Sequence, residues 1–207
     1  MTSAVEVRQT APADFPAIVA MSERIYGAGA AWKAELLASH LEVFPEGQLV
    51  ATVDGAVAGM AASLIVLWDD YALDTAWRDF TAGGTFRNHD PERGRTLYGA
   101  EIMVAPEFRG AGVGSRLYEA RWSLVERLGL RRIRAGARLR GYHQVAGRMS
   151  AAEYVAEVVA GARRDPTLSF QLARGFRVIG VVDGYLRFDP ESLGKAAVIE
   201  RVNPAAD

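Results

Sequence analysis

The sequence of 207 residues contains no cysteine and only three histidines, and its charges nearly cancel. Without cysteine the chain cannot form disulfides, thiolate metal sites or cysteine nucleophiles. The histidines, at positions 40, 89 and 143, do not have a spacing typical of a metal site, so we expect no metal. A formal net charge of −1 does not favour binding to nucleic acid or to an anionic membrane.

Long apolar segments are also missing from the chain. The longest, from Ala56 to Trp68, falls short of the roughly 20 residues that a membrane-spanning helix needs. The first residues, Met1 to Glu6, lack the basic and apolar regions of a signal peptide. We therefore expect a cytoplasmic protein that does not bind a membrane. Hydrophobic residues make up 50% of the chain, which at this length favours a single domain over residues 1–207.

The pattern of hydrophobic residues predicts an α/β domain. Strands are predicted at residues 5–9, 48–53, 56–67, 97–104, 131–136, 176–182 and 195–202, and helices at 15–26, 31–41, 113–128, 150–161 and 166–174. The dipeptide Asp54-Gly55, between two apolar runs, is typical of a two-residue hairpin turn. Gly59 in the second strand of this hairpin predicts a bulge or a bend.

One stretch joins the predicted strand 97–104 to the predicted helix 113–128 through Arg109-Gly-Ala-Gly-Val-Gly114. Glycine lets another group approach the backbone closely, and the first N–H groups of a helix have no intrahelical partner. Together with the helix dipole, these groups form a site for a phosphate or a pyrophosphate. Ser115-Arg116 after the last glycine excludes a P-loop, and the glycine spacing fits a dinucleotide fingerprint poorly.

This stretch closely resembles motif A of the GNAT (GCN5-related) N-acetyltransferases, in which Val-x-Pro ends a strand and Arg/Gln-x-x-Gly-x-Gly/Ala opens a helix. The matching residues are Val104-Ala-Pro106 and Arg109 to Gly114. The resemblance implies the GNAT fold, an α/β fold with a mixed, mostly antiparallel sheet of about seven strands. The sheet would be splayed between strands four and five and flanked by helices, with insertions at about 68–95 and 137–164.

The resemblance also implies a reaction, the transfer of the acetyl group of acetyl-CoA to a primary amine of a small molecule or a peptide. Dimers are common in the family, so a homodimer is possible. Backbone groups of the fourth strand would pair with the pantetheine arm of coenzyme A, namely those of Ile102, Met103 and Val104. Backbone amides of the turn would hold the pyrophosphate, namely those of Arg109, Gly110, Ala111, Gly112, Val113, Gly114 and Ser115. Two alternatives stay open: a regulatory domain that only binds acyl-CoA, and an oxidoreductase whose turn binds a dinucleotide.

A single carboxylate, Glu101, lies in the middle of the otherwise apolar strand 97–104. Burying a carboxylate is costly unless the group is paired or its pKa is raised. A carboxylate with a raised pKa can remove a proton from an ammonium group, so Glu101 is a candidate general base. The alternative interpretation is a structural carboxylate paired with one of the many arginines.

The sequence departs from the family pattern at the position where a tyrosine often protonates the departing thiolate. The matching run is Phe170 to Phe176, and Gln171 takes the place of the tyrosine. An amide cannot act as a general acid, which favours the alternative of a domain that only binds acyl-CoA. Tyr142 and His143, which follow the fifth strand, are candidates for the missing acid, although a histidine in a loop is more often just solvated.

Three further features lie outside the motif. By the resemblance, residues 68–95 would lie near the acetyl-transfer point as a lid or an acceptor pocket, or else form a packed surface excursion. Arginines at 131, 132, 134, 138 and 140 predict a mostly solvated face, from which one or two could meet the 3′-phosphate of coenzyme A or an acidic acceptor. The placement of the insertions and of Asp189-Pro-Glu-Ser192 is similar to that in GNAT domains fused to carbon–nitrogen hydrolases.

Overall fold

The computed structural model describes residues 4–206, so part of the N-terminal segment considered above lies outside the described residues. Seven strands form one sheet. They are β1 (Val5–Gln9), β2 (Gln48–Val53), β3 (Ala56–Val66), β4 (Thr96–Val104), β5 (Arg132–Arg138), β6 (Arg177–Val182) and β7 (Ala196–Val202). The helices are α1 (Phe15–Tyr26), α2 (Ala34–Val43), α3 (Trp77–Phe80), α4 (Val113–Arg127), α5 (Ala151–Val159) and α6 (Leu168–Leu172).

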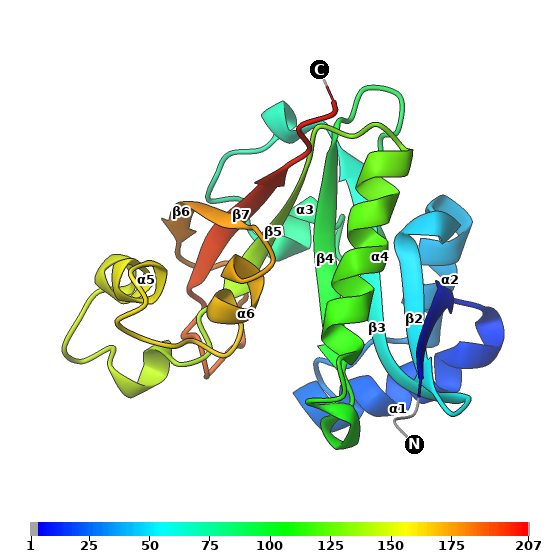
Figure 1. Ribbon diagram of the computed structural model, residues 1–207, viewed down its shortest axis with the longest axis horizontal. Coiled ribbons are helices and arrows are strands. Elements are labelled where there is room, and N and C mark those ends of the chain that lie inside the picture. The colour runs from blue at the N-terminus through cyan, green and yellow to red at the C-terminus, as the bar shows by residue number, and fades with distance from the viewer. Residues whose placement is uncertain (1–3, 207) are drawn as a thin grey trace.

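The sheet has the strand order β1-β2-β3-β4-β5-β7-β6. Neighbouring strands are antiparallel except β4 and β5, which run parallel. The pairing of β4 with β5 extends only from Thr96, opposite Arg132, to Tyr98, opposite Arg134. Beyond Tyr98 the two strands diverge, as Figure 1 shows. This mixed sheet with a splayed centre confirms the fold predicted from the sequence.

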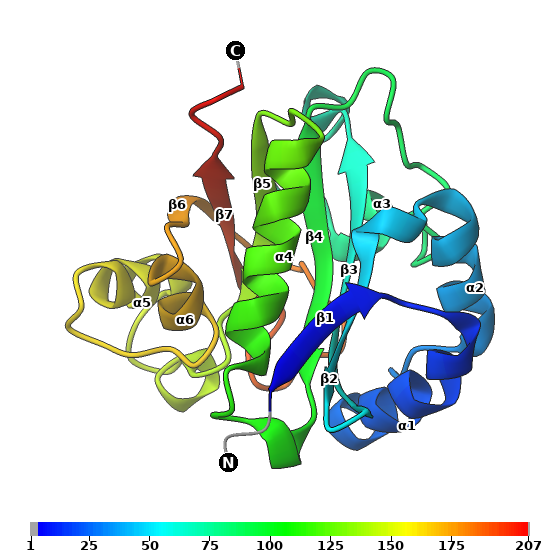
Figure 2. The ribbon, with the colours of Figure 1, turned by 45° about the vertical axis from the view of Figure 1, so that its right-hand side comes forward.

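Helices cover both faces of the sheet (Figures 1 and 2). On one face, Val113 and Leu117 of α4 pack against apolar side chains of β2 and β3, among them Ala61. On the other face, α1, α2 and α3 enclose a second apolar cluster, which includes Met60 and Ala62 of β3. Because successive side chains of a strand point to opposite faces, the alternation in β3 separates the two clusters. The gap between β4 and β5 therefore lies between two layers of helices.

Several boundaries differ from the predicted ones by a few residues. The predicted helix 31–41 is observed as Ala34–Val43, because Lys33 before it is extended, with φ −106° and ψ 148°. β5 continues to Arg138, so the segment 137–164 begins inside the strand. The predicted bulge near Gly59 is confirmed, since the register between β2 and β3 shifts at Ala51 and Thr52, opposite Gly59 and Val57. Among the described residues, no helix combines the length and the apolar character that a membrane span requires.

The segment 68–95 packs into the domain as one wall of the layer that contains α1 and α2. Its aromatic side chains Trp68, Phe80 and Phe86 are buried. The rings of Phe80 and Tyr98 stack with centroids 4.7 Å apart, which joins the segment to β4. The segment is packed and its residues reach the centre of the sheet, while a role as a lid or an acceptor pocket stays a prediction.

Candidate active site

The glycine-rich turn between β4 and α4 has the backbone conformation that its glycines permit. Gly110 and Gly112 have φ of +83° and +85°, which strains a residue with a Cβ. Gly112 is the N-cap residue of α4. Within residues 4–206, the backbone N–H groups of residues 112–115 have no intramolecular hydrogen-bond acceptor. The positive end of the α4 dipole and four free donors therefore meet at the exposed turn, where an anion can bind.

A cationic side chain that the sequence analysis did not single out lies beside this turn. Arg174, just after α6, donates a hydrogen bond from Nη2 to Oγ of Ser115. Its guanidinium also stacks on the ring of Phe170, with Cζ 3.2 Å from the ring centroid. A Cβ on Gly114 would lie 3.1 Å from Cζ of Phe170, so this glycine permits the close approach of α4 and the α6 segment. A positive charge is thus fixed next to the free amides.

The strand residues predicted to pair with pantetheine lie along the gap between β4 and β5. Ile102, Met103 and Val104 pair with Ala61, Met60 and Gly59 of β3 on one edge of β4. On the other edge, β5 pairs with β4 only as far as Tyr98, so among the described residues no strand covers this part of β4. An extended chain can therefore add to the free edge as another strand would.

A β-bulge in β4 lies just beyond the last residue pair between β4 and β5. Ala62 of β3 is opposite Glu101 and Ser63 is opposite Gly99, which leaves Ala100 as the extra residue. Two long side chains hold the bulge. Trp77 donates a hydrogen bond of 2.8 Å from Nε1 to the carbonyl oxygen of Ala100. Arg121 of α4, which is buried, donates to the carbonyl oxygens of Ala62 and Glu101.

The Glu101 side chain projects from this bulge into the layer of α1 and α2. Its carboxylate accepts hydrogen bonds from the Tyr26 hydroxyl (2.9 Å), from Nε1 of Trp32 (3.2 Å) and from the backbone N–H of Ile102 (2.9 Å). Burial raises the pKa of Glu101 above its ordinary value, while the three hydrogen bonds to the carboxylate act in the opposite direction. Within residues 4–206 no arginine or lysine forms an ion pair with it, although the charge of Arg138 also lowers its pKa. Whether the carboxylate is catalytic or structural stays a prediction.

Two tyrosines bridge the start of the gap. The hydroxyl groups of Tyr98, on β4, and Tyr185, between β6 and β7, lie 2.5 Å apart. The ring of Tyr185 lies against Gly136 of β5, where a Cβ would be only 2.0 Å from Cζ of the tyrosine. Glycine at this position of β5 is therefore required for Tyr185 to reach β4. Both hydroxyl groups are buried, which raises their pKa values.

Gln171, at the position of the missing family tyrosine, contacts a second residue that the sequence analysis passed over. Nε2 of Gln171 donates a hydrogen bond of 2.8 Å to the hydroxyl oxygen of Tyr118, and both residues are buried. Tyr118 lies on α4, about one turn after Ser115. Its ring also packs near Phe170, with centroids 5.7 Å apart. A titratable hydroxyl group is thus present beside the amide, on the face of the sheet that carries α4.

Tyr142 and His143, the predicted candidates for a general acid, lie outside this group. The Tyr142 hydroxyl donates to the carbonyl oxygen of Met149 at 3.1 Å, and its ring packs near Tyr154 of α5. His143 is exposed, and its Nδ1 lies 2.8 Å from the carbonyl oxygen of Glu191. Within residues 4–206, neither side chain forms a hydrogen bond with Glu101 or Gln171. Their catalytic role stays a prediction.

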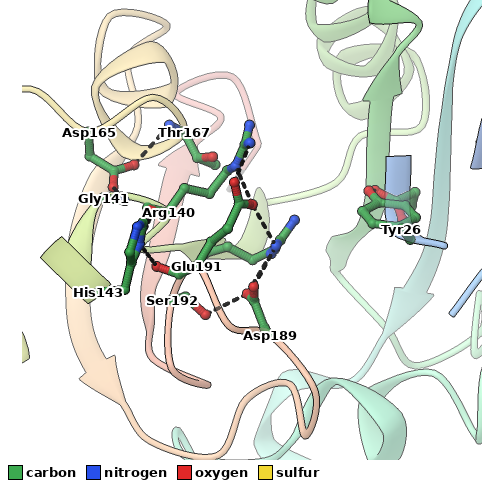
Figure 3. A network of polar contacts seen from close by, with 11 residues as sticks. Tyr26, Arg140, Gly141, His143, Asp165, Thr167, Asp189, Glu191 and Ser192 are labelled. Atoms are coloured by element: carbon green, nitrogen blue, oxygen red, sulfur yellow. Dashed lines mark hydrogen bonds and ion pairs between the residues drawn. The ribbon is translucent and has the colours of Figure 1, made fainter. Parts of the chain in front are cut away.

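The arginines of β5, and Arg140 just after it, are paired with carboxylates rather than solvated. Figure 3 shows Arg140 beside Glu191 of the loop between β6 and β7. Arg138 contacts Asp189 of the same loop. Arg138 forms two hydrogen bonds with Asp189, of 2.6 and 2.5 Å, and Arg140 forms two with Glu191, of 2.8 and 2.7 Å. Two more arginines of β5, Arg132 and Arg134, contact Glu200 of β7. The predicted solvated face is wrong for these four arginines.

Comparison with known proteins agrees with this geometry. The model of the acetyltransferase (GNAT) family matches residues 8–147. The chain belongs to the GNAT family. An uncharacterized N-acetyltransferase of Bacillus subtilis, YkwB, is 38% identical to this GNAT protein over 172 residues, which cover 83% of the chain and 75% of YkwB.

A second relative and one solved structure are named for reactions other than acetyl transfer. YhcX of Bacillus subtilis, named a probable hydrolase, is 39% identical over 194 residues, which cover 94% of this GNAT chain but only 38% of YhcX. The similarity to domains fused to hydrolases thus matches YhcX in part. The solved structure of GphF, a GNAT-like decarboxylase in complex with isobutyryl-CoA, has a TM-score of 0.77 at 24% identity and covers 95% of this chain and 98% of its own. That likeness shows a shared fold.

Proposed function

We propose that this GNAT protein transfers the acetyl group of acetyl-CoA to a primary amine of a small molecule or a peptide. The observation that carries the proposal is the free edge of β4, which leads from the bulge at Ala100 to the unpartnered amides at the start of α4. The amides can bind a pyrophosphate, and the strand edge can pair with an extended pantetheine arm. A base near the bulge can remove a proton from the amine that attacks the thioester. Acetyl-CoA is a substrate that joins these three features.

The binding part of the proposed reaction rests on backbone groups. The N–H groups of residues 112–115 would hold the pyrophosphate, with Arg109 and the other residues of the turn around it, and Arg174 would add a positive charge. The backbone of Ile102, Met103 and Val104 would pair with the pantetheine arm. This arrangement would place the thioester beside the bulge, where backbone donors of β4 can polarise its carbonyl group.

The chemical part of the proposed reaction rests on Glu101. Its raised pKa suits a base that removes a proton from an ammonium group at neutral pH. Tyr26 and Trp32, which donate hydrogen bonds to the carboxylate, hold it in place and form an aromatic wall on the acceptor side. Holding the amine next to the thioester would account for much of the rate enhancement, as in other reactions between two bound substrates.

Binding and catalysis are tested by separate measurements. Acetyl-CoA should raise the melting temperature of the protein, because a ligand that binds only the folded state stabilises it, whereas NADP should leave it unchanged. A response to NADP alone would contradict the proposal and favour a dinucleotide-binding oxidoreductase. Thiol release from acetyl-CoA and from isobutyryl-CoA is then followed with a panel of amines, amino acids and peptides. Stabilisation by acetyl-CoA without thiol release across the panel would favour a protein that only binds acyl-CoA.

A further inference from the structure

The amide of Gln171 is oriented with its nitrogen toward the hydroxyl group of Tyr118. The amide nitrogen of Gln171 supplies the hydrogen, so the hydroxyl oxygen of Tyr118 is the acceptor. The hydroxyl hydrogen of Tyr118 therefore remains available for another group. Within residues 4–206 this hydroxyl group donates no hydrogen bond, and the amide oxygen of Gln171 also has no partner. A buried donor without an acceptor is costly, so a group that binds in this place and accepts the hydrogen would satisfy it.

Tyr118 lies between the proposed pyrophosphate site and the bulge of β4. It lines a cavity of about 660 Å³ between α4, β7 and the end of α6, together with Ser115 and Arg174 of the proposed pyrophosphate site. In Figures 1 and 2, α6 lies beside the N-terminal half of α4. The guanidinium of Arg121 lies 5.7 Å from the centre of the Tyr118 ring and donates to the carbonyl oxygen of Glu101. Tyr118 is therefore one side chain away from the bulge.

The other tyrosines near the gap are engaged elsewhere. The Tyr26 hydroxyl donates its hydrogen to Glu101, and the Tyr142 hydroxyl donates to Met149. Tyr98 and Tyr185 are hydrogen-bonded to each other and belong to the apolar cluster on the face of α1 and α2. Tyr118, in contrast, contacts the residue that replaces the family tyrosine.

We propose that Tyr118 is the general acid of this protein and that Gln171 orients its hydroxyl group. This inference rests on the proposed acetyltransferase function. Glu101 removes one proton from the ammonium group of the acceptor, and the amine nitrogen attacks the thioester carbon. The C–N bond forms, the C–S bond breaks, and the sulfur takes the proton of Tyr118. The nitrogen loses its second proton, which returns through water to the phenolate, so that one proton per turnover passes from Glu101 to solvent.

The environment of Tyr118 suits this role. Burial raises the pKa of Tyr118, while Arg121 and the amide of Gln171 act in the opposite direction. The hydroxyl group therefore keeps its proton at neutral pH until a thiolate forms beside it. Arg121 and Arg174, the two cations that act on Tyr118, would also stabilise the phenolate during the short time before it regains a proton.

The test compares single and double variants in the thiol-release assay, with the best amine of the panel. Tyr118→Phe should lower kcat about 100-fold, which is the usual effect of losing a general acid, and leave the Kd for acetyl-CoA unchanged. The matched control is Tyr71→Phe, since the Tyr71 hydroxyl also accepts an amide hydrogen, from Asn88 at 2.7 Å, but lies outside the cavity. Tyr71→Phe should keep the wild-type kcat.

A double variant tests whether a tyrosine at position 171 can replace Tyr118 as the general acid. Adding Gln171→Tyr to Tyr118→Phe puts a hydroxyl group at the family position and should recover kcat about tenfold or more. Wild-type kcat in Tyr118→Phe, or no recovery in the double variant, would overturn the proposal.

A second measurement covers the case in which Tyr118→Phe does not fold. Difluorotyrosine at position 118 keeps the hydroxyl group but lowers its pKa, so the alkaline limb of the kcat profile should move to lower pH. An unmoved limb would overturn the role of Tyr118. The wild-type protein separates this result from the proposed function: if the wild type releases no thiol with any amine, the acetyltransferase proposal fails, and the proposal for Tyr118 falls with it.

Discussion

Trp77 donates a hydrogen bond of 2.8 Å to the carbonyl oxygen of Ala100, so a segment inserted between β3 and β4 holds the bulge beside Glu101. The Trp77 ring also lies edge-on to Trp32, with ring centroids 5.8 Å apart, and Trp32 donates to the Glu101 carboxylate. The segment 68–95 thus contacts the backbone next to Glu101, the proposed base, and the ring of Trp32, which donates a hydrogen bond to the Glu101 carboxylate.

Removing this hydrogen bond should affect catalysis more than stability. Trp77→Phe keeps an aromatic ring but leaves the Ala100 carbonyl without its donor, which costs about 1 kcal/mol of stability. We expect kcat to fall several-fold, because the bulge that positions Glu101 is less well fixed. The control is Trp68→Phe, whose indole lies 4.4 Å from the guanidinium of Arg134, away from the bulge. Equal losses of kcat in both variants would contradict a specific role for Trp77.

Glu101→Gln tests the proposed base. The amide keeps the shape of the side chain, and its one oxygen can still accept the hydrogen bond from Tyr26, but its NH2 group would face Trp32 and it cannot take a proton. We expect kcat to fall about 100-fold or more, with the Kd for acetyl-CoA nearly unchanged. A variant that keeps the wild-type turnover, or that loses its fold instead, would show that the carboxylate is structural.

The pH profile gives an independent check on the same residue. A base must be deprotonated, and the pKa of Glu101 is raised by burial, so kcat/KM should fall as the pH drops through this raised pKa. The acidic limb should therefore lie above the pH at which an ordinary glutamate titrates, which is about 4.3. In Glu101→Gln the residual activity should lose this limb. A limb that persists in the variant would belong to another group.

Gly112→Ala separates backbone strain from ligand binding. Gly112 has φ +85°, and alanine in this conformation costs about 1–2 kcal/mol, while its methyl group would project at the proposed pyrophosphate site. We expect a lower melting temperature and a Kd for acetyl-CoA that rises tenfold or more, by about 1.4 kcal/mol. Gly129→Ala is the matched control, since Gly129 has φ +60° at the other end of α4 and open space around it. It should lower the melting temperature without changing the Kd.

His40 should make the stability of the protein depend on pH. Its ring is buried, stacks on Phe86 at 3.7 Å and contacts the carbonyl oxygen of Gly84 at 2.7 Å. Burial lowers the pKa of His40 to about 4. The unfolded state, with an ordinary pKa of about 6.5, binds the proton first, so the free energy of unfolding should decrease by about 3 kcal/mol as the pH falls from 6.5 to 4.

The measurement for His40 is urea unfolding at several pH values. His40→Gln cannot titrate, so the free energy of unfolding of this variant should change less between pH 6.5 and 4 than that of the wild type. An identical slope in the two proteins would assign the pH dependence to other groups. The carboxylates with lowered pKa values, such as Asp14 and Asp189, lose their stabilising effect at lower pH and form a separate part of the curve.

Local features of the sequence were sufficient to predict the turn before α4 and the order of the strands and helices, except for the short helix α3. The alternation of apolar residues and the pair Asp54-Gly55 gave the hairpin of β2 and β3. The glycines between Arg109 and Gly114 indicated the turn, and in the structure Gly110 and Gly112 have the positive φ that glycine permits. These signals depend on residues that are close together in the chain, so they are visible without a structure.

The tertiary structure decided which distant side chains share a site. Glu101 could be picked out as a lone carboxylate in an apolar strand, but Tyr26, Trp32 and Trp77 join it from segments 24 to 75 residues away. Gln171 and Tyr118 are 53 residues apart in the sequence, and no local pattern predicts that they are in contact. Hydrogen-bond partners and ion pairs are selected by the packing of helices on the splayed sheet. The sequence by itself therefore determined the glycine-rich turn, the fold and the position of Glu101, whereas the side chains around Glu101 and Gln171 became recognisable only in three dimensions, because packing brings distant segments together.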